Sequence, residues 1–112
     1  MCLALLIGVE TICEVGFNAG HSAGVFLVSN PRARVISFDL GNLAWSDAQV
    51  QYISSLFPNR LTYVKGNSQT KIKEYAMENP SVKCDLWSID GDHGPNAELD
   101  FEGYYYTLLY DY

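Results

Sequence analysis

A run of eleven residues near the start of the chain, residues 12–22, constrains the fold more than any other segment. It reads ICEVGFNAGHS: an apolar stretch that ends at the acid Glu14, two glycines at Gly16 and Gly20, and then residues that suit a helix. Glycine permits the tight turn and the close backbone approach that a ligand-binding loop needs. The run therefore predicts the first strand, loop and helix of an α/β nucleotide-type site.

Two further acids close later apolar runs in the same way. Asp39 follows the segment VISF, and Asp90 follows LWSI. With Glu14, they place three carboxylates at the ends of three expected strands. Open parallel sheets bind ligands in the crevice at the carboxyl ends of their strands, so we expect these acids to face one site.

The rest of the chain alternates between short apolar runs and segments of helical periodicity. We expect strands over residues 11–15, 34–39, 60–64 and 84–90. Helical spacing follows each of them, over residues 21–28, 46–57, 67–79 and 97–108. This alternation predicts a Rossmann-like three-layer αβα fold with a mostly parallel sheet, and the usual strand order of its first half is 3-2-1-4.

Local signals suggest how two of these helices begin. Ser46 followed by Gln49 has the spacing of a capping box. Asn67 or Ser68 can cap the third helix.

Length bounds the domain organisation. A chain of 112 residues makes one domain at most, so we treat residues 1–112 as a single unit. The pattern stops soon after the fourth strand, which predicts a partial domain that is incomplete in its C-terminal half. The outer edge of the fourth strand would then be open, and an open edge favours self-association.

Charge and cysteine usage narrow the partners and the location. The net charge of −6 disfavours a nucleic-acid partner, which needs a basic face. No stretch approaches the roughly 20 apolar residues of a spanning helix, so no membrane partner is expected. Cys2, Cys13 and Cys84 show no C-x-x-C spacing. We expect them to be buried free thiols, an arrangement that suits a reducing compartment and so a cytoplasmic protein.

The glycine loop departs from the dinucleotide fingerprint G-x-G-x-x-G. Asn18 stands where the second glycine would let a pyrophosphate approach the backbone, and this favours a phosphate-free nucleoside ligand over a dinucleotide. Asp39 lies 23 residues after Gly16, close to the spacing of a ribose-binding acid. A carboxylate can accept both hydroxyls of a ribose, so this role is favoured over that of a turn residue.

Four segments in this order and spacing resemble class I S-adenosylmethionine-dependent methyltransferases. They are residues 14–22 (EVGFNAGHS), 37–40 (SFDL), 64–68 (VKGNS) and 89–93 (IDGDH). The branch most similar is that of small-molecule O-methyltransferases with an I-D-G-D-H segment after strand four. The resemblance covers roughly residues 10–102.

The resemblance implies S-adenosylmethionine as the cofactor and a role for each matched residue. Glu14 would order the loop and the methionine ammonium, and Asp39 would bind the ribose diol. Asp90 would lie beside the methionine part or a metal. The other expected cofactor-binding residues are the loop under the methionine and ribose with its following helix turn, the neighbour of Asp39, and the residues near adenine: Gly16, Phe17, Asn18, Gly20, Ser22, Leu40, Asn67 and Ser68.

His93 is the expected catalytic residue. A hydroxyl acceptor must lose its proton during methyl transfer, and a histidine at a strand end can act as the general base. The alternative is that His93 only hydrogen-bonds its own loop or orients Asp90. Metal-dependent members of the superfamily take further ligands from a fifth strand, which this chain lacks, so we predict no metal site.

These expectations define the leading function: methyl transfer from S-adenosylmethionine to a small-molecule acceptor, at oxygen. A second hypothesis is a non-catalytic remnant that binds the cofactor weakly or pairs with another chain through its open sheet edge. A third is another Rossmann-like nucleotide binder, for example for NAD, against which Asn18 counts. Whether so short a chain is itself an active enzyme stays open at this stage.

Overall fold

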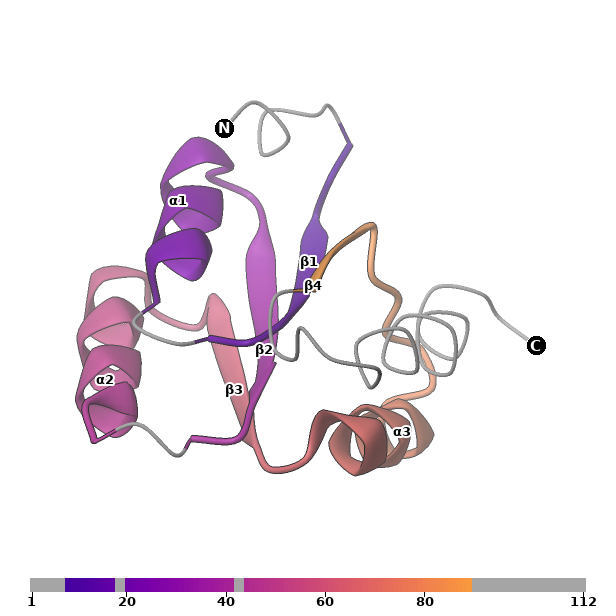
Figure 1. Ribbon diagram of the computed structural model, residues 1–112. Helices are drawn as coiled ribbons and strands as arrows, with labels where there is room; N and C mark the ends of the chain where they lie inside the picture. Colours follow the sequence, from indigo (N-terminus) through magenta and orange to yellow (C-terminus); the bar gives the residue numbers. More distant parts are fainter. Residues whose placement is uncertain (1–7, 18–19, 42–43, 90–112) are drawn as a thin grey trace.

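The computed structural model describes residues 8–17, 20–41 and 44–89 (Figure 1). Strands and helices alternate along the chain, as the sequence pattern predicts. They are β1 (Thr11–Val15), α1 (His21–Ser29), β2 (Arg34–Asp39), α2 (Ser46–Leu56), β3 (Leu61–Lys65), α3 (Ser68–Glu78) and β4 (Leu86–Ile89). The expected helix over residues 97–108 lies outside the described residues.

The four strands form one parallel sheet in the order β3-β2-β1-β4, which confirms the predicted strand order. The chain winds outward from β1 to β3 and then returns to place β4 on the other side of β1. Between β1 and β4 the direction of winding therefore reverses. Such a switch point leaves a crevice at the carboxyl ends of the strands, where α/β sheets bind their ligands.

Helices cover both faces of the sheet (Figure 1). One face packs against α1 and α2 in a core that contains Ile12, Phe26 and Ile53. The opposite face packs against α3 around Ile36 and Ile72. All five residues of β1 are buried because the strand is covered on both sides, and they include the polar Thr11 and the acid Glu14. The predicted three-layer Rossmann-like architecture is confirmed.

The helix starts confirm one prediction and correct another. The side chain of Asn67 accepts a hydrogen bond from the backbone N–H of Gln69 at 2.9 Å, which is the predicted cap of α3. The capping box predicted at Ser46 is wrong, because Trp45 is the N-cap residue of α2 and no side chain caps it. Ser46 is fully buried and lies close enough to the phenol of Tyr63 to influence its pKa.

The two outer strands of the described sheet, β3 and β4, begin later in the sequence than predicted. β3 begins at Leu61 and not at Arg60, because the Arg60 guanidinium turns back to three carbonyls near the end of α1 and the start of β2. These are the carbonyls of Leu27 at 2.9 Å, Asn30 at 2.5 Å and Ala33 at 2.7 Å. β4 begins at Leu86 and not at Cys84.

The segment just before β4 is tied to β1 in two ways. The Asp85 carboxylate accepts the backbone N–H groups of Glu10 and Thr11, both at 2.9 Å. Cys84 forms a disulfide with Cys13, with the two Cα atoms 5.7 Å apart. Both anchors hold β4 against β1.

The disulfide corrects the prediction for two of the three cysteines, since Cys2 lies outside the described residues. Cys13 and Cys84 are fully buried, as expected, but they are bonded to each other and are not free thiols. Adjacent strands bring together residues that are 71 positions apart in the sequence, and the absence of a C-x-x-C spacing gave no sign of this. Disulfides persist in oxidising surroundings, so the cysteine argument for a reducing compartment loses its basis.

Candidate functional site

The candidate site lies where β1 and β2 end, beside the switch point of the sheet. Gly16 follows β1 and donates its N–H to the carbonyl of Phe38 at 2.8 Å, which continues the pairing of the two strands. Its φ of 99° lies in the region that favours glycine. Gly20 is the N-cap residue of α1, with φ 84°, and donates its N–H to the carbonyl of Phe17 at 2.8 Å.

The side chain of Phe17 supports this loop from the core side. Its side chain is 2% exposed and belongs to the core under α1 and α2. A Cβ atom on Gly20 would lie 2.9 Å from the Phe17 ring, so this position has no room for a side chain. The Phe17 ring also meets Tyr63 edge to face, with centroids 5.2 Å apart. The side chain of Phe17 therefore supports the loop, and only its backbone is placed to contact a ligand.

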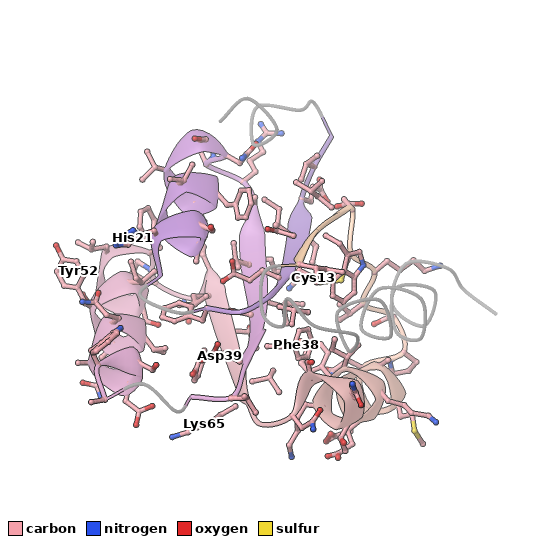
Figure 2. The ribbon with its side chains drawn as sticks, viewed as in Figure 1. Cys13, His21, Phe38, Asp39, Tyr52 and Lys65 are labelled. Atoms are coloured by element: carbon pink, nitrogen blue, oxygen red, sulfur yellow. A yellow bond between two sulfur atoms is a disulfide. The ribbon has the colours of Figure 1, made fainter. Side chains whose placement is uncertain are left out.

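Asp39 is the best-anchored polar group of the site. Its Oδ1 accepts the backbone N–H of Phe17 at 3.0 Å. Its Oδ2 accepts the backbone N–H of Gly41 at 2.9 Å and the hydroxyl of Tyr63 at 3.1 Å. The carboxylate thus joins the β1 loop, the β2 loop and β3. Figure 2 shows Asp39 at the end of β2 and on the opposite side of that strand from Phe38, toward α1 and α2.

Tyr63 was missed by the sequence analysis, in which it was only a residue of the third strand. Burial raises the pKa of its phenol well above the ordinary value, and the negative charge of Asp39 and the hydrogen bond to it add to the shift. Ser46 acts in the opposite direction. The phenol therefore stays protonated and remains a donor to Asp39. Side chains alternate along a strand, so the sequence could place Tyr63 on the opposite face of the sheet from Val64. That Tyr63 meets Asp39 is shown only by the register between β2 and β3.

Glu14 lies one residue before the end of β1 and is 1% exposed. It shares the α1 and α2 face with Ile12 because side chains alternate along a strand. Its register partners are Ser37 in β2 and Ser88 in β4. The two roles that the family resemblance implied for Glu14, ordering of the loop and contact with the methionine ammonium, stay predictions.

The remaining predicted residues are placed as follows. Ser22 is half-buried in the first turn of α1. Leu40 follows Asp39 directly and is 59% exposed, which leaves an apolar surface beside the carboxylate. Asn67 and Ser68 lie at the start of α3, on the carboxyl side of β3. Asn18, Asp90 and His93 lie outside the described residues, so their roles stay predictions.

Within residues 8–17, 20–41 and 44–89, no three side chains of His, Cys, Asp or Glu gather closely enough to hold a metal ion. In the same part of the chain, no helix combines the length and the apolar character needed to cross a bilayer.

The fold and the site together define a class: a Rossmann-like α/β domain with a glycine loop after β1 and an anchored acid after β2. No protein-family model and no curated protein sequence matches the chain. Solved structures do match, and several methyltransferases are among them.

One match is the calicheamicin methyltransferase CalS11, with a TM-score of 0.74 and 16% identity over 95% of this chain. Another is a putative caffeoyl-CoA O-methyltransferase from Staphylococcus aureus, with a TM-score of 0.67 and 20% identity over 89% of this chain. A third is the C-terminal domain of precorrin-6Y C5,15-methyltransferase from Rhodobacter capsulatus, with a TM-score of 0.64 and 14% identity over 92% of this chain.

At these identities the likeness establishes the fold: this chain has the Rossmann-like fold of the methyltransferases that it matches. The chain spans about half the length of these proteins, namely 56%, 46% and 52% of the three.

Proposed function

We propose that this chain is the cofactor-binding part of an S-adenosylmethionine-dependent methyltransferase that acts on an oxygen of a small molecule. The observation that carries the proposal is the anchored carboxylate of Asp39 beside the loop between Gly16 and Gly20. The fold shared with solved methyltransferases supports it. The choice of oxygen rests on the sequence resemblance and on the O-methyltransferase among the structural matches.

The described residues fit a nucleoside cofactor. Asp39 keeps acceptor capacity for a hydroxyl, Leu40 offers an exposed apolar surface beside it, and Gly20 keeps the loop free of a side chain. When bound, S-adenosylmethionine supplies a methyl group on a sulfonium sulfur, which an acceptor oxygen can displace. In this proposal Asp39 binds the ribose, and Asn67 and Ser68 lie near the adenine.

The acceptor side of the proposal rests on residues outside the described part. His93 would take the proton from the acceptor hydroxyl, and Asp90 would lie beside the methionine part. Both roles come from the family resemblance of residues 89–93.

Replacement of Asp39 tests the cofactor proposal. Asp39→Ala should weaken the binding of S-adenosylhomocysteine by about 5- to 150-fold, as expected for lost hydrogen bonds to a charged group. Isothermal titration calorimetry measures the change, and circular dichroism checks that the variant is folded. Glu78→Ala is the matched control, because Glu78 is an exposed acid on α3. Equal affinities of the wild-type and Asp39→Ala chains would contradict the proposal.

A second proposal concerns association with another chain. Among the described strands β4 pairs only with β1, and its four residues are half-buried, whereas every residue of β1 is buried. An edge strand with an unpaired side is a template for a further strand. We propose that this edge of β4 accepts a second chain, in which case the domain works as part of an assembly or as a non-catalytic cofactor binder.

A further inference from the structure

The hydrogen bonds of Asp39 limit how it can bind a ribose. Each carboxylate oxygen has two lone pairs available as acceptors. On Oδ2 both are used, one by the backbone N–H of Gly41 at 2.9 Å and one by the hydroxyl of Tyr63 at 3.1 Å. On Oδ1 the N–H of Phe17 uses one, at 3.0 Å. Counted over the described residues, these bonds leave one acceptor position on the carboxylate, and it lies on Oδ1.

The phenol of Tyr63 is held in place from several sides. Its ring packs edge to face on the buried ring of Phe17, and it lines the core under α1 and α2. Tyr63 lies opposite Ser37 in the register of β2 and β3, so it reaches Asp39 diagonally from within the sheet. Because its pKa is raised, the hydroxyl keeps its proton at any pH at which a methyltransferase works. A ligand hydroxyl that approaches Oδ2 of Asp39 from the crevice therefore finds the acceptor position already occupied by the Tyr63 hydroxyl.

We propose that Tyr63 is a positioning residue that occupies Oδ2 of Asp39 and thereby restricts the site to a single ribose hydroxyl, bound at Oδ1. The inference rests on the proposed function, since it takes the ligand to be an adenosine-type nucleoside. It replaces the expectation that Asp39 binds both hydroxyls. The single-hydroxyl contact makes the site discriminate between nucleosides that lack the 2′-hydroxyl and those that lack the 3′-hydroxyl.

Three ligands test this inference: S-adenosylhomocysteine and its 2′-deoxy and 3′-deoxy forms. Calorimetry gives the affinity of the full chain for each. We expect the affinity of the wild-type chain to be about 10-fold or more lower for one deoxy form than for S-adenosylhomocysteine, and to change little for the other deoxy form. In Tyr63→Phe the second position on Oδ2 becomes available, so the two deoxy forms should bind within about 3-fold of each other. Tyr52→Phe, an exposed tyrosine on α2, is the control and should keep the wild-type ratio.

The ratio of the two deoxy affinities separates positioning from a purely structural role, because a loosened fold would weaken all three ligands alike. Equal losses with both deoxy forms in the wild-type chain would overturn the inference, and so would a wild-type ratio retained in Tyr63→Phe. If the wild-type chain binds S-adenosylhomocysteine, either outcome refutes the role of Tyr63 alone. If it does not bind, the proposed function fails and this inference fails with it.

Discussion

At the scale of single residues, the site depends on Asp39 and on the groups that hold it. Two backbone amides and one phenol converge on its carboxylate from three different segments. Hydrogen bonds to a charged acceptor are about twice as strong as those between neutral groups. The carboxylate therefore fixes the loops after β1 and β2 relative to β3, and it is oriented before any ligand arrives.

The raised pKa of Tyr63 predicts how stability depends on pH. Burial is the main cause and Asp39 adds to it, so the native state keeps a proton that the unfolded chain loses near pH 10. This contribution to stability is complete below about pH 10 and is lost as the pH rises above that value. Denaturant unfolding between pH 8 and 11 should show a steeper loss of stability for the wild-type chain than for Tyr63→Phe.

Absorbance near 295 nm provides the direct check on this titration. At pH 11 the native wild-type chain and Tyr63→Phe should show the same phenolate signal, because Tyr63 is still protonated. Asp39→Asn should lower the pKa of Tyr63 only in part, since burial remains. A wild-type signal that exceeds that of Tyr63→Phe by one tyrosine at pH 10 to 11 would show that the pKa is not raised.

At the scale of the elements, the sequence was informative wherever a strand or helix is covered on both sides or ends at a strong signal. The bounds predicted for β1 and β2 match the structure, because apolar and β-branched residues dominate both buried parallel strands and an acid or a glycine marks where each ends. The cap at Asn67 is local and was predictable. Ser46 has the same local chemistry but is buried by tertiary packing, which no local pattern can show.

The same reasoning explains what was missed in the site. Asp39 and the glycines of the loop were predictable because their spacing along the chain carries the signal. The contact between Tyr63 and Asp39 and the disulfide between Cys13 and Cys84 both join neighbouring strands that are far apart in the sequence. Both depend on the lateral register of the sheet, for which a single sequence contains no direct signal.

The disulfide between Cys13 and Cys84 should stabilise the fold and hold β4 against β1. It closes a long loop, since its cysteines are 71 residues apart, so reduction or Cys84→Ser should lower the unfolding free energy by roughly 2–4 kcal/mol. Hydrogen exchange should increase most at the amides of β4. Cys2→Ser serves as the control, because Cys2 takes no part in this disulfide. Three reactive thiols in the denatured, unreduced chain would show that the bond does not form.

At the scale of the whole molecule, the proposed interface is the outer edge of β4, with which no other described strand pairs. The N–H of Asp85 points to β1, where it donates to the carbonyl of Thr11 at 2.8 Å. Since amides alternate along a strand, the N–H of Ser88 faces the outer edge. This edge is the place at which a further strand would pair.

Sedimentation tests this edge. We expect the wild-type chain to associate as its concentration rises, and Ser88→Pro to weaken that association because proline removes an outward donor. Ser88→Ala is the control, since it keeps the N–H. A wild-type chain that stays monomeric and unfolds cooperatively over the whole concentration range would rule out the edge as an interface.

The central claim is that a nucleoside cofactor binds at the carboxyl ends of β1 and β2. An amide NMR titration of the ¹⁵N-labelled chain with S-adenosylhomocysteine tests it most directly, with NAD as the competing ligand. The account predicts saturable shifts for the amides of Phe17 and Gly41, which donate to Asp39, and for that of Gly20 in the neighbouring loop, and weaker binding of NAD. Absence of shifts at these amides, or tighter binding of NAD, would contradict it.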